Sequence, residues 1–267
     1  MLSVRKCQGF GPRRQIPVYW KPATPEQALT RTDRNHVTTD RTTFYDRMSA
    51  EKDWDDWTNT YETQRRLDLI FGDLLKDIEL TGARFLDAGC GGGHFSARAS
   101  ARGAKVVSMD VGTHLLAQVA KRCASQGTVG SVLQLPFPDA SFDVVMSTEV
   151  VEHTTEPLAA VAAIARVVKP GGWLVLTTPG RLWQPVVRLA SALHLRPYQG
   201  YENFVWPQHA RRAVEEQGIV VDRFQGFNLL PLFHPTFEAL HGVMDRIGPV
   251  LPWTCVNFAI RGRRRSG

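Results

Sequence analysis

The chain has 267 residues, of which 43% are hydrophobic and 22% charged, the ordinary balance of a soluble globular protein with a sizeable core. No apolar run reaches the roughly 18 residues that a membrane span needs. The net charge is +6, but the basic residues gather near the two ends, which we interpret as solvated tails. We therefore expect a small-molecule partner, no nucleic acid, and at most a peripheral membrane contact through the basic ends.

The first 45 residues carry few acids, several arginines and several prolines, a composition that predicts a loosely ordered extension. A transit peptide has a similar bias, but the prolines interrupt any amphipathic helix. One α/β domain is expected over residues 46–262, followed by a basic tail over 263–267. The four cysteines are far apart and form no CxxC pair, which argues against a disulfide framework or a zinc site and favours a cytoplasmic location.

Hydrophobic periodicity predicts a helix over residues 54–77, and short apolar strands then alternate with helical stretches. A further helix is expected to end at Lys169–Gly172, where Pro and Gly form a stop signal. This alternation predicts a mostly parallel sheet with helices on both faces. The expected strands are 83–88, 105–110, 142–148 and 172–179.

The last third of the chain is less regular. A helix should begin at Pro207 and end before Gly218, and two final strands are expected at 219–225 and 254–260. Residues 180–207 are aromatic-rich and look irregular, and residues 227–252 are apolar with several prolines. We interpret both segments as insertions over the carboxyl edge of the sheet, where doubly wound folds bind their ligands. Tyr201, Phe204 and Trp206 suit contact with a flat apolar ring, or plain packing.

The first strand ends in a glycine-rich turn, Asp87-Ala88-Gly89-Cys90-Gly91-Gly92-Gly93, that opens a helix. Glycines let the backbone approach a ligand, and the helix N-terminus offers N–H groups to a carboxylate. The dinucleotide fingerprint GxGxxG needs a glycine where this chain has His94. The spacing is GxGxG, with an acid two residues earlier, which favours S-adenosylmethionine (SAM), whose methionine carboxylate is anionic. Asp110 ends the next strand, where an acid can accept both ribose hydroxyls.

Four blocks in order resemble the class I SAM-dependent methyltransferases: FLDAGCGGG, VVSMD, LPFPDASFDVVMSTEVVEH and VVKPGGWLVLTTP. The resemblance implies a Rossmann-like, seven-stranded α/β fold. Within that superfamily, TEVVEH followed by KPGG and TTP is similar to the ubiquinone-pathway O-methyltransferases of the UbiG type, which methylate hydroxyls on polyprenylated aromatic rings. The lysine–glycine–threonine–histidine stretch of those enzymes has no clear counterpart here.

The resemblance implies SAM contacts at Gly89, Asp110 and Thr148, and at a helical arginine, either Arg66 or Arg65. The adenine contact of the superfamily falls on Ser131 or on the backbone near Val132. The metal-binding residues of the ubiquinone-pathway enzymes match Glu149, Glu152 and His153. The cofactor site is thus expected to contain Arg66, Asp87, Gly89, Gly91, Gly93, Asp110, Ser131, Val132 and Thr148.

Glu149, Glu152 and His153 are also the candidate catalytic residues, because a phenol has a pKa near 10 and needs a base or a metal at neutral pH. If the chain turns helical after Thr148, the three side chains share one face of one turn. They could then form half of a Mg²⁺ site, or His153 could act as general base, oriented by a glutamate.

The expected activity is O-methylation of an aromatic or quinol-like hydroxyl. N- or C-methylation of a sugar, amine or natural-product scaffold is the alternative, and it would need no metal. A nucleic-acid methyltransferase is less expected, because no NPPY-type motif follows the fourth strand and no RNA-binding module is appended.

Overall fold

The computed structural model describes residues 60–193, 201–229, 248 and 250–266. The expected extension over residues 1–45 and most of the expected insertion over 227–252 lie outside the described residues, so both stay predictions. None of the described helices is long and apolar enough to cross a bilayer.

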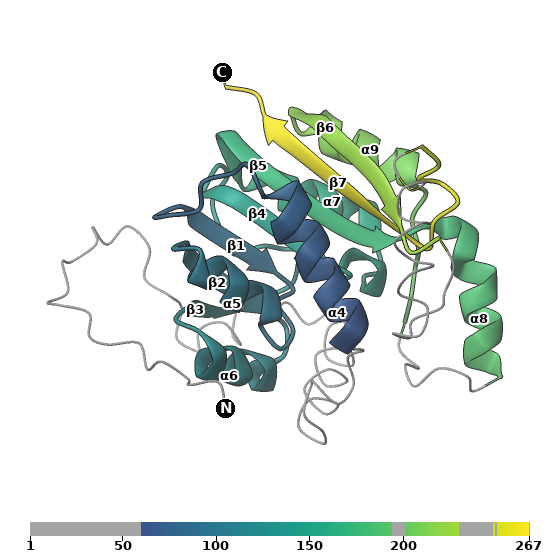
Figure 1. Ribbon diagram of the computed structural model, residues 1–267, viewed down its shortest axis with the longest axis horizontal. Coiled ribbons are helices and arrows are strands. Elements are labelled where there is room, and N and C mark those ends of the chain that lie inside the picture. The colour runs from purple at the N-terminus through teal and green to yellow at the C-terminus, as the bar shows by residue number, and fades with distance from the viewer. Residues whose placement is uncertain (1–59, 194–200, 230–247, 249, 267) are drawn as a thin grey trace, which may run out of the picture. The chain divides into compact units, whose positions relative to one another are not determined.

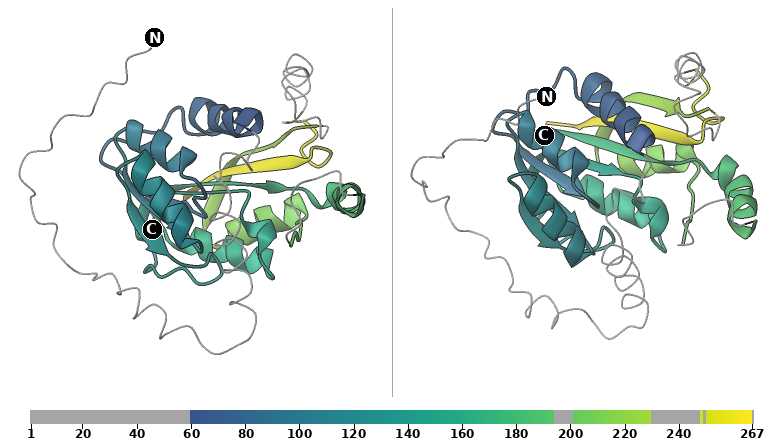
Figure 2. Two further views of the ribbon diagram at one scale, coloured as in Figure 1. Left: turned by 90° about the horizontal axis from the view of Figure 1, so that it is seen from below. Right: turned by 60° about the horizontal axis from the view of Figure 1, so that its bottom comes forward.

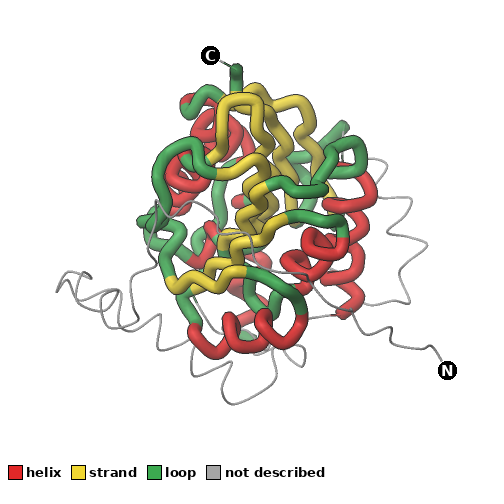
Figure 3. The backbone as a smooth tube through the Cα atoms, turned by 90° about the vertical axis from the view of Figure 1, so that its left-hand side faces the viewer, coloured by secondary structure: helices red, strands yellow, loops and turns green. Residues whose placement is uncertain are grey.

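A seven-stranded sheet in the order β3-β2-β1-β4-β5-β7-β6 forms the centre of the described part (Figures 1 and 3). All neighbouring pairs are parallel except those of β7, which runs antiparallel to both β5 and β6. This confirms the predicted Rossmann-like sheet. The strands are β1 (Arg84–Ala88), β2 (Lys105–Asp110), β3 (Gln126–Val129), β4 (Phe142–Thr148), β5 (Val168–Pro179), β6 (Ile219–Phe227) and β7 (Asn257–Arg264).

Helices cover both faces of the sheet (Figure 2). The first helical segment and α5 pack on one face, with Phe71, Phe85 and Phe95 in one core cluster. Helices α7 and α9 pack on the other face in a second cluster. The helices are α4 (Thr60–Leu67), continued by a π-helical turn (Asp68–Leu74), then α5 (His94–Ala101), α6 (Thr113–Arg122), α7 (Pro157–Arg166), α8 (Gln184–Ala192) and α9 (Pro207–Glu216).

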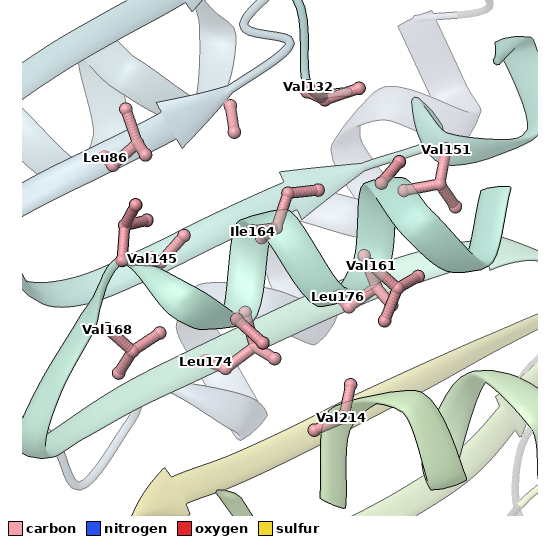
Figure 4. Close-up of a cluster of buried hydrophobic side chains, with 14 of the residues drawn as sticks. Leu86, Val132, Val145, Val151, Val161, Ile164, Val168, Leu174, Leu176 and Val214 are labelled. Carbon is pink, nitrogen blue, oxygen red and sulfur yellow. The ribbon is translucent and has the colours of Figure 1, made fainter. Parts of the chain in front are cut away.

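The second cluster brings together side chains from strands and helices that are distant in sequence (Figure 4). Val161 and Ile164 lie on the buried face of α7, and they pack with Leu174 and Leu176 of β5. Burying one such side chain contributes roughly 2 kcal/mol. The core therefore fixes β4 and β5 side by side, and with them the loops at their carboxyl ends.

The structure differs from the sequence prediction in three segments. Helix α7 ends at Arg166, and the Pro–Gly–Gly segment lies inside β5 rather than in a helix stop. The register between β4 and β5 is irregular there, and a Cβ on Gly172 would meet the Asp143 carbonyl oxygen at 2.8 Å. Glycine therefore permits a bulge. The segment 180–207, predicted to be irregular, contains α8, and the predicted strand 254–260 is observed as Asn257–Arg264.

Candidate active site

The order of the sheet reverses between β1 and β4, which is the place where ligands bind in doubly wound sheets. The glycine turn follows the carboxyl end of β1, and Thr148 ends the neighbouring β4. The predicted cofactor turn and the predicted catalytic segment therefore lie next to each other, although some 60 residues separate them in sequence.

The glycine turn has the backbone that its sequence predicts. Gly89, Gly91 and Gly93 have φ angles of 83°, 49° and 83°, a region that side chains rarely adopt. A Cβ on Gly89 would lie 2.6 Å from Val150 Cγ1, so this turn also packs too closely for a side chain. Helix α5 begins at His94, and no side chain caps it. Its N-terminus thus suits an anionic group such as the methionine carboxylate of SAM.

Asp110 lies at the end of β2 and fastens the glycine turn. Its Oδ2 accepts a hydrogen bond from the Gly91 N–H at 2.9 Å, and its Oδ1 accepts one from the Gly112 N–H at 3.0 Å. The carboxylate lies at the carboxyl end of β2, the position from which an acid reaches the ribose of a bound nucleoside in this type of sheet. The geometry fits the predicted ribose contact.

Asp87 connects the glycine turn to helix α5 through a hydrogen bond. Its Oδ2 accepts a hydrogen bond of 2.7 Å from the Ser96 hydroxyl of α5, and Ser96 in turn contacts Ser108 at 2.7 Å. Burial raises the pKa of Asp87 to about 7, with a smaller contribution from the negative charge of Asp110. Within the described residues its Oδ1 is buried without a hydrogen-bond partner. This orphaned oxygen fits a site that is completed by a ligand or a water.

The segment after β3 lies beside Asp110, because the Gly130 N–H donates to the Asp110 carbonyl at 3.0 Å. A turn follows in which the Gln134 N–H donates to the Ser131 carbonyl, and Val132 is buried in the core. Ser131 and Val132 thus directly follow a residue that is hydrogen-bonded to Asp110, which fits the predicted contact near the adenine.

The two candidate arginines of α4 have different surroundings. Arg65 NH1 donates to the Asn228 side-chain oxygen at 2.5 Å, so its guanidinium is engaged with the end of β6. Arg66 Nε is buried and has no hydrogen-bond partner among the described residues. Its positive charge acts on both Glu149 and Glu152. Arg66 therefore has unused donor capacity for a cofactor carboxylate, whereas Arg65 is already engaged.

Glu149 follows β4 directly and has a left-handed backbone, with φ 54°. Its Oε1 accepts a hydrogen bond from Thr177 Oγ1 at 2.9 Å, and its Oε2 accepts one from Asn257 Nδ2 at 2.6 Å. Burial raises the pKa of Glu149 to about 8, the negative charge of Glu152 adds to the rise, and Arg66 opposes it.

Glu152 and His153 lie in a short 3₁₀ turn, Val151–His153. Glu152 Oε2 accepts a hydrogen bond from Thr178 Oγ1 at 2.9 Å, and burial raises the pKa of this carboxyl to about 8. His153 Nε2 lies 3.8 Å from Glu152 Oε1, and His153 Nδ1 lies 3.0 Å from the Tyr201 carbonyl oxygen. A carbonyl can only accept, so Nδ1 carries a proton and Nε2 of the neutral ring is the basic nitrogen.

The prediction that Glu149, Glu152 and His153 share one helical face is wrong. Thr177 and Thr178 are consecutive residues of β5, so their side chains project to opposite faces of the sheet. Each threonine donates to one glutamate, and the backbone between them is not helical, because Glu149 has a left-handed φ and the 3₁₀ turn begins only at Val151. Within the described residues, no group of three or more His, Cys, Asp or Glu side chains could hold a metal ion. The residues present therefore do not fit the Mg²⁺ half-site.

The segment 201–205 is hydrogen-bonded to the 3₁₀ turn that contains Glu152 and His153. The Asn203 N–H donates to the Glu152 carbonyl at 2.7 Å, and Gly180 pairs with Val205. Of the aromatic residues expected to cover the acceptor, Phe204 is buried, whereas Tyr201 and Trp206 are 48% and 43% exposed. Only the last two thus have surface available for a ligand. Sequence reasoning missed Thr177, Thr178 and Asn257, for which the TTP after the fourth strand was the one local signal.

Comparison with known proteins agrees with this geometry. A family model described as a methyltransferase domain matches residues 86–176. The ubiquinone biosynthesis O-methyltransferase of Leptothrix cholodnii is 30% identical over 168 residues, which cover 58% of this chain and 71% of that protein. Its counterpart from Thiobacillus denitrificans is 31% identical over 165 residues, which cover 57% and 71%.

Solved structures share the fold. A SAM-dependent methyltransferase from Mesorhizobium loti superposes with a TM-score of 0.57 at 17% identity, covering 78% of this chain and 99% of that one. The [4+2]-cyclase SpnF superposes with a TM-score of 0.53 at 21% identity, covering 76% and 81%. The fold therefore also serves other chemistry, and the sequence relatives decide the activity. The chain belongs to the class I SAM-dependent methyltransferases and is an enzyme that transfers a methyl group from SAM.

Proposed function

We propose that the chain methylates a hydroxyl group on an aromatic or quinol-like small molecule. The observation that carries this proposal is the position of His153 next to two buried carboxyls, those of Glu149 and Glu152, at the carboxyl end of β4 beside the glycine turn. A hydroxyl acceptor needs such groups because it must lose its proton. The relatives named as O-methyltransferases support the same acceptor class.

When bound, SAM supplies an electrophilic methyl carbon. The acceptor oxygen forms the new bond to that carbon while the methyl–sulfur bond breaks and its electron pair stays on sulfur. The hydroxyl proton goes to the enzyme. Gly89, Gly91, Gly93, Asp110 and Arg66 would hold the cofactor, Ser131 and Val132 would border the adenine, and Asp87 would brace the turn.

His153 is the group that we assign to receive the proton. Its Nδ1–H is directed to the Tyr201 carbonyl, so Nε2 is the nitrogen that we assign as the base, and Glu152 Oε1 lies 3.8 Å from that nitrogen. Thr148 ends β4 and Glu149 follows it directly, at a position from which Glu149 would orient the acceptor hydroxyl toward the methyl group. No step in this scheme passes through a metal.

The test is methyl transfer from isotope-labelled SAM to a panel of a catechol, a hydroquinone, an aromatic amine and transfer RNA. We expect labelled methyl ether from the first two, identified by mass spectrometry. His153→Gln should lower kcat by about 10²- to 10⁴-fold, without changing the affinity for SAM. The loss should shrink near pH 10, where the phenol ionises on its own. His209→Gln on the exposed face of α9 is the matched control.

Exclusive labelling of the amine or the RNA would overturn the acceptor class. Full activity of His153→Gln would remove this residue as the base. Incubation with a chelator should leave the wild-type rate unchanged. A loss of activity that Mg²⁺ restores would instead support the metal-assisted route implied by the family resemblance. We also propose a cytoplasmic location, which is supported by the free thiols of the described cysteines, Cys90, Cys123 and Cys255.

A further inference from the structure

Two buried asparagines lie behind Glu149. Asn257 is the first residue of β7 and is 3% exposed, and Asn228 follows β6 and is 1% exposed. A buried amide is costly unless both its oxygen and its nitrogen are hydrogen-bonded. Neither asparagine belongs to the two hydrophobic core clusters, so we infer the role of each side chain from its hydrogen bonds.

The asparagines form a directed chain of hydrogen bonds from α4 to Glu149. Arg65 NH1 donates to Asn228 Oδ1 at 2.5 Å, and Asn228 Nδ2 donates to Asn257 Oδ1 at 3.2 Å. Asn257 Nδ2 then donates to Glu149 Oε2 at 2.6 Å. A guanidinium can only donate, so it fixes the orientation of the first amide, and the first amide fixes that of the second.

The Glu149 carboxyl is consequently held at both oxygens, by Thr177 on one and by Asn257 on the other. Its backbone is held as well, because the Glu149 N–H donates to the Thr177 carbonyl at 3.0 Å. Glu149 and Asn228 both have left-handed backbones, with φ 54° and 55°, although neither is glycine. Such conformations persist where surrounding bonds over-determine them, and they concentrate at functional sites.

We propose that Asn257 is a positioning residue for methyl transfer, which acts by fixing the Glu149 carboxyl in the orientation that receives the acceptor hydroxyl. Asn228 and Arg65 support it by setting the direction of its amide. The proposal rests on the proposed function, because it places Glu149 at the acceptor. Reaction rates depend steeply on such orientation, so a loosened carboxyl should lower turnover more than binding.

The decisive variant is Asn257→Asp, which keeps the shape of the side chain but replaces its donor with an acceptor facing Glu149. We expect kcat to fall about 10- to 100-fold, with the acceptor KM and the SAM affinity within about twofold of wild type. Gln225→Glu is the matched control. It makes the same change on neighbouring β6, where Gln225 Nε2 donates to Asp73 Oδ2 at 3.2 Å, and it should leave kcat unchanged.

A double-mutant cycle separates positioning from simple stability. If Asn257 acts through Glu149, Asn257→Asp should cost little further kcat in a Glu149→Gln background. The double variant should also regain thermal stability, because the amide introduced at position 149 can donate to the carboxylate introduced at position 257, yet it should not regain turnover. Additive losses in kcat, or a rate that follows stability alone, would overturn the proposal.

If Asn257→Asp does not fold, Asn228→Ser tests the same chain one bond further from Glu149 and should lower kcat in the same direction by a smaller factor. Unchanged kcat in a folded Asn228→Ser would contradict the directed chain. The cycle can be run on whichever acceptor the wild-type enzyme methylates. Loss of the hydroxyl acceptor class would therefore be distinguishable from loss of the role of Asn257.

Discussion

Asp110 offers the sharpest test of the cofactor site, because its carboxylate has two separable tasks. In the structure it accepts hydrogen bonds from the Gly91 and Gly112 N–H groups, which fasten the glycine turn. In the proposed complex it also accepts the two ribose hydroxyls of SAM. Asp110→Ala removes both tasks, so the measurement must separate cofactor affinity from the stability of the turn.

Each hydrogen bond to a charged group is worth about 1.5–3 kcal/mol, so two ribose contacts amount to roughly 3–6 kcal/mol. Asp110→Ala should therefore raise the Kd for SAM by about 10²- to 10⁴-fold. The free protein should lose about 2 kcal/mol in unfolding free energy, because water can replace part of the lost bonds to Gly91 and Gly112. Isothermal titration with SAM and chemical denaturation without it measure the two quantities.

Asp139→Ala is the control, since it removes the same charge from an exposed side chain that pairs with Arg166. It should leave the SAM affinity unchanged. If folded Asp110→Ala bound SAM with a Kd within threefold of the wild-type value, the assignment of Asp110 as the ribose contact would fail. If its affinity fell only in proportion to its stability, the carboxylate would be a brace for the turn and not a ligand contact.

Three further changes test the scaffold of the site. In Gly89→Ala, the new side chain would have to adopt a φ of 83° and would clash with Val150. The variant should therefore lose SAM binding and unfold at a lower temperature. Normal SAM binding by the variant would refute the close packing of this turn. In Gly72→Ala, the Cβ added in the π-helical turn would meet no atom within 4 Å. The variant should raise the free energy of unfolding by about 0.5–1 kcal/mol, as measured by urea denaturation, and a lower free energy of unfolding would contradict this expectation. Asp87 has a pKa of about 7 in the folded protein against an ordinary value of 3.8, so the folded state holds more protons between these limits and the free energy of unfolding should fall as pH rises from about 4 to 7. The contribution of Asp87 is at most about 4 kcal/mol. Asp87→Asn should therefore make this part of the pH profile less steep in urea denaturation at pH 5 and 7.5, while Glu149 and Glu152, whose pKa values are raised to about 8, maintain the remaining slope. An unchanged slope would show that Asp87 does not contribute.

Local sequence signals predict the backbone of the glycine turn well, because glycine spacing reports directly on backbone shape. The parallel sheet followed from the alternation of strands and helices. The strand Gln126–Val129 was not predicted, because it is a short edge strand with mostly exposed residues and has no apolar pattern. The bulge in β5 was misread as a helix stop because Pro and Gly mark both features.

The candidate catalytic segment is harder to predict, because its conformation depends on residues of distant strands. Helical spacing of Glu149, Glu152 and His153 was a reasonable local expectation, and no residue in that segment contradicts it. The left-handed Glu149 instead pairs with Thr177, 28 positions later, and with Asn257, 108 positions later. Only the folded sheet brings these partners to it.

Thr177 and Thr178, which are consecutive residues of β5, explain how Glu149 and Glu152 can have different roles although they are close in sequence. Thr177 alternates with Val175, whose side chain packs with α4 and α5, and it donates to Glu149, while Thr178 alternates with Leu176, whose side chain packs with α7 and α9, and it donates to Glu152. The alternation of the strand thus gives each of the two neighbouring acids its own hydroxyl donor. We infer a division of work, in which the first carboxyl orients the acceptor and the second supports His153 as the base. Asn257 donates to Glu149, so this division requires that a substitution of Asn257 should affect the orientation of the acceptor without affecting the proton acceptor.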